Sequence, residues 1–213
     1  MKTDHFVAML ASGNVAVAPH APARRYATAL GIGALGSVIL MLVLLGPRFD
    51  LADALWIPMF WVKITFVAVL AFASVHLALR LARPGSGLRW VPSALAAPII
   101  AMWLLAALLL IGVDSEQRYI LLFGTTSKSC PWLIALLSVP VFVAVIWAMK
   151  GLAPTRLRIA GGAAGLAAGA VGALVYCLHC PEMAAPFIGT WYVLGILIPT
   201  AVGAVLGPRL LRW

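Results

Sequence analysis

The residues with the greatest capacity for chemistry are gathered in one short stretch near the end of the chain. It reads Tyr176-Cys177-Leu178-His179-Cys180-Pro181-Glu182, and it offers two thiols, an imidazole and a carboxylate. The remaining cysteine is Cys130. Thiolates with an imidazole suit zinc, cadmium or copper(I), and thiols in an oxidising compartment also form disulfides. The residues leave four interpretations open: a structural disulfide, a thiol or metal sensor, inert buried thiols, or a catalytic dithiol.

Composition shows what kind of protein must hold these side chains. Of 213 residues, 64% are hydrophobic and 10% are charged, whereas a soluble domain has about 45–50% and about 25%. This excludes a soluble globular monomer, because too few polar side chains are present to cover its surface. It also excludes a disordered chain, and three cysteines are too few for a disulfide scaffold. The sequence therefore predicts an all-α, polytopic membrane protein.

Six apolar segments have the length of a spanning helix, about 20 residues. They cover residues 26–46, 55–79, 90–113, 131–149, 159–178 and 187–206. We expect a short tail over 1–25 and a six-helix membrane domain over 26–213, surrounded by lipid. Ionisable groups inside the spans are scarce, which disfavours a small permease. Lys63 is expected to snorkel to the outer interface or to pair with Asp53.

The distribution of charge predicts the orientation. Most basic residues flank the spans on one side: Lys2, Arg24, Arg25, Arg80, Arg83, Arg89, Lys150, Arg156, Arg158, Arg209 and Arg212. Most acidic residues lie on the other side: Asp50, Asp53, Asp114, Glu116 and Glu182. The positive-inside rule then places both termini in the cytoplasm of a bacterial cell, with the chain in the inner membrane. The net charge of +9 is explained by this topology, and no direct nucleic-acid partner is expected.

Spans four and five are expected to form an antiparallel hairpin around Thr155. Cys130 and Cys180 are equally far from Thr155 along the chain, so the hairpin places both at the outer membrane surface. The fifth span carries glycines at every fourth position, Gly161, Gly165 and Gly169, which allow close approach of a neighbouring helix. We expect this ridge to pack within the bundle and to bring Cys180 near its neighbour, with a homodimer through the ridge as the alternative.

Several stretches of the chain resemble the NrsF family, bacterial inner-membrane negative regulators of sigma-F-type extracytoplasmic-function sigma factors. The resemblance is carried by the Tyr176–Glu182 string, by Phe60-Trp61-Val62-Lys63, by the Leu152-Ala153-Pro154 turn, and by the ending Leu210-Leu211-Arg212-Trp213. It implies a six-helix membrane anti-sigma factor with an extracytoplasmic-function sigma factor as its partner, no enzymatic activity and no resident cofactor.

The resemblance also implies that Cys130 and Cys180 are two periplasmic sensor cysteines. Cys177 is an extra thiol whose role the resemblance leaves open. By their residue types, Cys177, His179 and Glu182 are candidate accessory ligands for transient heavy-metal binding. Oxidant or metal would change the cysteine pair, shift the hairpin and free the sigma factor. The alternative enzyme, a membrane thiol-disulfide oxidoreductase, needs two communicating cysteine pairs, whereas this chain has three cysteines.

The N-terminal tail is long enough to hold a partner. Thr3 is expected to cap a helix over Asp4–Ser12, with Phe6, Met9 and Leu10 on one face. So short a helix is marginal alone in water, but it can order in a hydrophobic groove of a sigma factor. The alternative is a helix lying on the membrane. Gly13–Ala23 reads as a linker.

The charge distribution makes a direct test of topology. Alkaline phosphatase, which is active only outside the cytoplasm, should be active when fused after Ser127 and inactive when fused after Gly87. Blotting for both fusions controls for expression. Activity at Gly87 would overturn the orientation.

Overall fold

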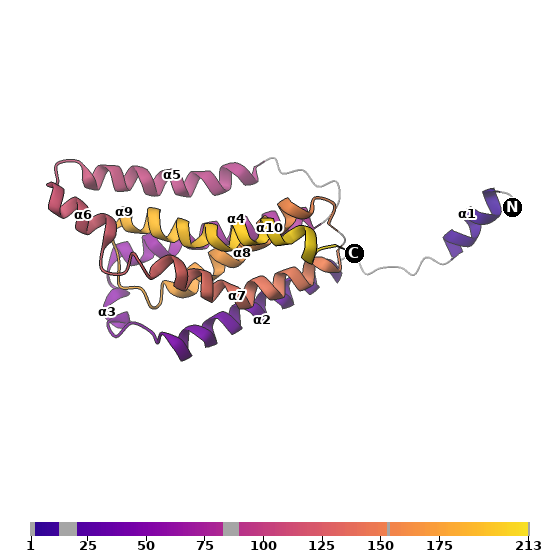
Figure 1. The fold of residues 1–213 in the computed structure, drawn as a ribbon, viewed down its shortest axis with the longest axis horizontal. Helices are drawn as coiled ribbons and strands as arrows, with labels where there is room; N and C mark the ends of the chain where they lie inside the picture. Colours follow the sequence, from indigo (N-terminus) through magenta and orange to yellow (C-terminus); the bar gives the residue numbers. More distant parts are fainter. Residues whose placement is uncertain (1–2, 13–20, 83–89, 153, 213) are drawn as a thin grey trace.

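The chain forms a bundle of long helices that run roughly side by side (Figure 1). This computed structural model describes residues 3–12, 21–82, 90–152 and 154–212. Six helices in these ranges are long and apolar enough to cross a membrane, and the described residues include no β-strand. The first five are α2 (Ala21–Leu44), α4 (Pro58–Leu81), α5 (Val91–Leu110), α7 (Cys130–Lys150) and α8 (Leu157–Tyr176). The sixth runs through α9 (Ala185–Phe187), the π-helical η1 (Ile188–Tyr192) and α10 (Val193–Leu210).

The six predicted spans are confirmed as helices, with shifted boundaries. Helix α2 begins at Ala21, before the predicted first residue Tyr26, and α8 ends at Tyr176 rather than at Leu178. Helix ends are the least certain part of a prediction from hydropathy, because the helix continues beyond its apolar stretch. The predicted positions of Lys2, Arg83 and Arg89 lie outside the described residues, as does most of the predicted linker.

Short helices occupy the segments outside the spans. Helix α1 (Thr3–Ser12) is the predicted N-terminal helix; it already includes Thr3, which is therefore a helical residue and not the cap. Helices α3 (Leu51–Ala54) and α6 (Ser115–Phe123) were not predicted. The side chain of Asp114 caps α6 by accepting a hydrogen bond from the backbone N–H of Gln117, an arrangement typical of helix N-termini.

Helix α8 lies at the centre of the bundle, and most of its residues are buried. Its glycines allow α10 to come very close. A Cβ atom at Gly161 would overlap the carbonyl oxygen of Gly203, and one at Gly165 would overlap that of Pro199. Small residues permit such contact because no side chain separates the two backbones. The prediction that the ridge packs within the bundle is confirmed.

The neighbour of the ridge, however, is α10 and not α7, so the expectation that the ridge draws Cys180 toward span four is wrong. Helix α7 instead meets Gly172, where a Cβ atom would lie 2.9 Å from the backbone nitrogen of Ser138. Because Gly161, Gly165 and Gly169 are buried against α10, the ridge offers no surface to a second copy. The structure therefore does not support the homodimer through these glycines.

The bundle has two chemically different ends (Figure 1). The end with α3, α6 and α9 carries Cys130 and Cys180 and is called the cysteine end. The opposite end carries the start of α2, the α7–α8 turn and the C-terminal end of α10, and is called the arginine end. At the arginine end the Arg25 side chain donates a hydrogen bond of 3.1 Å to the carbonyl oxygen of Trp147 and lies over its ring.

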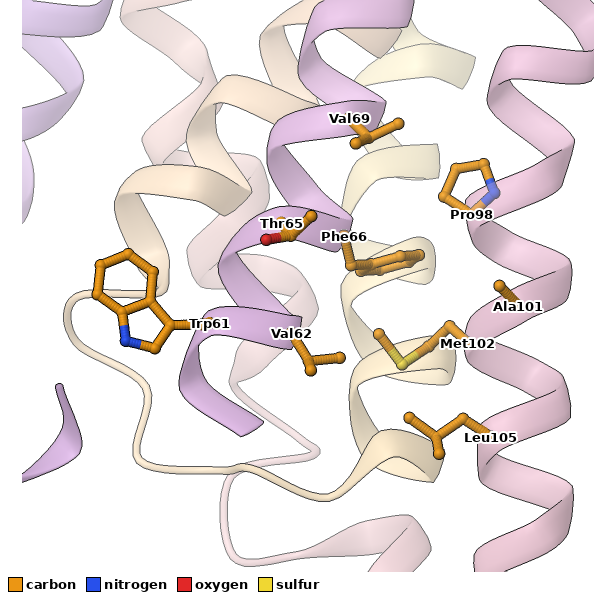
Figure 2. Close-up of a pocket in the computed structure, with 9 residues that line it drawn as sticks. All are labelled: Trp61, Val62, Thr65, Phe66, Val69, Pro98, Ala101, Met102 and Leu105. Carbon is orange, nitrogen blue, oxygen red and sulfur yellow. The ribbon is translucent and has the colours of Figure 1, made fainter. Parts of the chain in front are cut away.

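Helix α5 is the least enclosed of the six spans. Between it and α4 lies an apolar groove of about 420 Å³ (Figure 2). Its walls are Trp61, Val62, Thr65, Phe66 and Val69 of α4, and Pro98, Ala101, Met102 and Leu105 of α5. Helix α4 is thus tightly packed on its α8 side and loosely packed on its α5 side.

The close contact at Gly165 leads to a stability prediction. Gly165→Ala should lower the thermal midpoint of the purified protein in detergent, since overpacking a buried site costs about 1–3 kcal/mol. Gly162→Ala on the same helix is the matched control, because its Cβ would lie 3.5 Å from Ala204, an ordinary contact. The control should melt like the unchanged protein or slightly higher. Equal melting of both variants would contradict the close α8–α10 packing.

Candidate functional site

The three cysteines meet at the cysteine end, where α8 gives way to a turn. Cys130 is the first residue of α7, and its backbone N–H donates to the carbonyl oxygen of Thr126 at 2.9 Å. Cys177 directly follows α8, and the N–H of Cys180 donates to the carbonyl oxygen of Tyr176 at 3.0 Å. All three side chains are free thiols and are fully buried.

Cys130 and Cys180 lie within hydrogen-bonding distance of each other. The α7–α8 hairpin therefore brings together the pair that the sequence places at equal height. The hydrogen bond with the Cys130 thiol lowers the pKa of Cys180 below the usual thiol value, and the positive charge of Lys63 acts in the same direction against the effect of burial. A thiolate is the reactive form of cysteine, so Cys180 is the more nucleophilic member of the pair.

Cys177 has a different environment although it is close in sequence. Burial raises the pKa of its thiol to about 12, and this effect outweighs the opposing influence of Lys63. Cys177 therefore stays protonated near neutral pH. Helix α8 ends at Tyr176 and residues 177–179 form a turn, so the two cysteines do not lie on one continuous helix.

The structure does not bring the imidazole of His179 or the carboxylate of Glu182 together with the thiol pair. Nδ1 of His179 lies 2.9 Å from the carbonyl oxygen of Gly46. The carboxylate of Glu182 accepts hydrogen bonds from the backbone N–H and the hydroxyl of Thr125, at 2.7 and 2.8 Å. Within the described ranges no three His, Cys, Asp or Glu residues are grouped as metal ligands. His179 and Glu182 fasten the turn to neighbouring loops.

Lys63 is placed differently from the prediction. It neither reaches the outer interface nor pairs with Asp53: its side chain is fully buried. Its ammonium group donates to the carbonyl oxygen of Cys180 at 2.8 Å and to that of Glu182 at 3.0 Å. It also lies 5.3 Å from the centre of the Tyr192 ring. The charge is satisfied by backbone dipoles and an aromatic face, which is how a buried ammonium is tolerated.

A signal for the burial of Lys63 was present in the sequence. Phe60 and Val67 lie three residues before it and four residues after it, and both are buried. Residues with this spacing share a face of a helix. Lys63 therefore lies on the inward face of α4, although its charge and its closeness to Trp61 are typical of an interfacial residue.

Arg48 is a second cation at this end that the sequence analysis did not single out. Its side chain is almost fully buried and donates from Nε to Asp50 at 2.7 Å. That hydrogen bond lowers the pKa of the Asp50 carboxyl. The backbone N–H of Arg48 donates to the carbonyl oxygen of Leu178 at 3.0 Å. A cavity of about 740 Å³ lies beside this contact, bordered by the 45–50 loop, Thr126, His179 and Pro181.

The residues predicted to bind a partner lie in α1, which Figure 1 shows apart from the bundle. Met9 is 55% exposed and Val7 is 58% exposed. The backbones of Phe6 and Leu10 belong to α1, while their side chains lie outside the described part of the structure. An exposed short helix with large apolar side chains is suited to docking on a partner.

These features fit the class of helical membrane proteins: the chain has six candidate spans, a buried thiol pair at one end of the bundle, and a separate short helix with exposed apolar side chains. Residues 10–213 match the family described as "Negative regulator of sigma F", NrsF. The chain belongs to this family. No solved structure matches it.

Two curated relatives extend over the whole chain. The chain is 58% identical over 213 residues to the "Probable anti-sigma-F factor NrsF" of Azospira oryzae, and all of both chains is covered. It is 37% identical over 217 residues to the "Anti-sigma-F factor NrsF" of Caulobacter vibrioides, again over all of both chains. The resemblance drawn from the residues is thereby confirmed.

Proposed function

We propose that this chain is an inner-membrane anti-sigma factor that holds an extracytoplasmic-function sigma factor at its arginine end and releases it when the cysteine pair changes state. The observation that carries this proposal is the sequence similarity, over the full length of both chains, to two proteins named anti-sigma-F factors. The burial of Cys130 against Cys180 supplies the element that can respond to a signal. The chain itself performs no catalysis in this proposal.

The orientation follows from charge. Arg24, Arg25 and Arg209 belong to the arginine end, so the positive-inside rule places that end in the cytoplasm. The cysteine end then faces the periplasm, where disulfides persist. The helix α1 lies on the cytoplasmic side and presents its apolar face to the sigma factor. Binding orders a helix that is too short to be stable alone, and basic residues of the arginine end add contacts.

The signal acts on the thiols. With an oxidant of the disulfide class, the Cys180 thiolate attacks one sulfur of the oxidant and expels the other as a thiolate. The Cys130 thiol loses its proton to solvent, and the resulting thiolate attacks Sγ of Cys180 in the mixed disulfide and expels the second thiolate of the oxidant. A soft divalent metal ion would instead bridge the two sulfurs and displace their protons. Either event alters the α7–α8 hairpin. A disulfide stabilises the state that it constrains by about 2–4 kcal/mol. This matches or exceeds typical allosteric coupling of about 1–3 kcal/mol, so the bond is sufficient to drive the switch.

The partner surface is tested by placing charged residues on the apolar face of α1. Replacing Phe6 and Leu10 together with Asp should reduce capture of the sigma factor by the tagged, membrane-inserted protein at least about tenfold, because two apolar anchors worth about 1.5–3 kcal/mol each are lost. The matched control replaces Ala8 and Ser12 with Asp, which adds the same charge to the opposite face. Mass spectrometry of the captured protein gives the readout. Equal capture by both variants would place the contact in the basic loops.

The sensor is tested by single replacements of the cysteines. Cys130→Ser and Cys180→Ser should each abolish the response of a sigma-dependent reporter to diamide or cadmium, and the double variant should be no worse than either single one. Cys177→Ser is the matched control and should respond almost normally, since its thiol stays protonated. Peptide mapping should show a Cys130–Cys180 disulfide in the treated, unchanged protein. A normal response in the double variant would refute the sensor and leave the anti-sigma role standing.

A further inference from the structure

The buried ammonium of Lys63 is a feature that the proposed function does not use. In the part of the chain that the structure describes, Lys63 has no carboxylate partner, and the salt bridge present is Arg48–Asp50. The ammonium is instead held by two carbonyl oxygens, those of Cys180 and Glu182, at 2.8 and 3.0 Å. These carbonyls lie on either side of Pro181, so Lys63 clamps the segment that carries the more reactive sensor thiol.

We propose that Lys63 is a positioning residue that ties the Cys180–Glu182 segment to α4, so that a change at the cysteine pair is carried along α4 to the arginine end. This inference rests on the proposed function, because it names the path by which the cysteine pair acts. It assigns Lys63 no contact with the sigma factor. It is also separate from the effect of the Lys63 charge on the pKa of Cys180, because release is compared at equal fractions of disulfide.

The hydrogen bonds of Lys63 hold firmly because its buried ammonium is shielded from water, which could otherwise replace the two carbonyl acceptors. A fully buried ammonium that loses its hydrogen-bond acceptors is left unsatisfied in an apolar surrounding, which is far less favourable than moving with them. A covalent S–S bond is about 2.0 Å long, shorter than a hydrogen bond between two thiols. Bridging therefore draws Cys180 toward Cys130, and Lys63 follows the carbonyl oxygens that hold it.

Helix α4 is built to carry such a displacement. It runs without an internal proline from Pro58 to Leu81, whereas α5, α7 and α10 each contain proline in their interior. An uninterrupted helix moves as a rod, since sharp kinks occur mainly at proline and similar breaks. On its α5 side, α4 borders the apolar groove of about 420 Å³ (Figure 2). That groove leaves room for α4 to shift without displacing packed side chains.

The inference is tested with Lys63→Met, which keeps an unbranched side chain and removes the donor. Lys63→Arg keeps charge and donors, and Lys128→Met removes an exposed lysine at the same end as the matched control. Each full-length protein is kept in native membranes with its captured sigma factor and treated with diamide, which accepts two protons and two electrons as the disulfide forms. Two quantities are measured: the fraction of Cys130–Cys180 disulfide and the sigma factor that stays on the membranes.

We expect the unchanged protein and the Lys128 control to form the disulfide and to lose sigma factor at least about fivefold, the lower end of typical allosteric coupling. Lys63→Met should form the disulfide and retain its sigma factor, and Lys63→Arg should restore release. Release from Lys63→Met like that from the unchanged protein would overturn the inference while the proposed function stands. Loss of disulfide formation in a folded Lys63→Met would also overturn it, by assigning Lys63 to the thiol chemistry. No release from the unchanged protein after bridging would refute the proposed sensor instead.

A measurement on the unchanged protein covers the case in which Lys63→Met does not fold. Amide hydrogen exchange in lipid nanodiscs is followed in peptides over Pro58–Leu70, with and without the Cys130–Cys180 disulfide. The coupling predicts altered protection of these α4 peptides in the bridged protein relative to the reduced protein. Unchanged protection of α4 in the bridged protein would overturn the inference.

Discussion

The close packing of α8 is the constraint on which the rest of the bundle depends. Between helices surrounded by lipid there is little hydrophobic driving force, so stability comes from tight van der Waals contact. Glycine supplies that contact where Gly161 and Gly165 meet the backbone of α10. Helices α4, α7 and α10 all pack on α8, and the position of α8 therefore fixes where its C-terminal end and the following turn lie. The thiol pair is a consequence of this arrangement.

At the cysteine end, irregular backbone lies next to the candidate spans, and each buried carbonyl and N–H needs a partner. The turn after α8 obtains these partners from several parts of the chain. The ammonium of Lys63 in α4 and the N–H of Arg48 in the α2–α3 loop donate to backbone carbonyls of the turn. Thr125, in the loop after α6, donates to the side-chain carboxylate of Glu182. A segment held from so many directions cannot absorb a covalent change locally. The change must be passed to at least one of the elements that hold it.

Hydropathy was enough to predict the six spans, because a helix must shield its backbone over the whole apolar thickness and this leaves a long uniform signal. Hairpin symmetry was enough to bring Cys130 to Cys180. The spacing of Lys63 from Phe60 and Val67 could have shown that it faces inward. Sequence could not show its partners, because they are backbone carbonyls more than a hundred residues away and any residue type can supply a carbonyl. His179 and Glu182 resembled metal ligands, since spacing shows which side chains are near in sequence but not which loops fold over them.

In the proposed sensor, the free-energy difference between the free thiols and the bridged pair decides whether a signal is sent. A ligand or bond shifts an equilibrium only by its different free energy in the two states. A disulfide that fitted the Cys130–Cys180 contact without displacement would stabilise the held state and send nothing. A signal therefore requires that the disulfide be strained in the packing that retains the sigma factor. The same disulfide must be unstrained in the packing that releases it. In the proposed coupling, the burial of Lys63 against the carbonyl of Cys180 passes the displacement of the turn to α4, because the ammonium moves with the carbonyl that holds it.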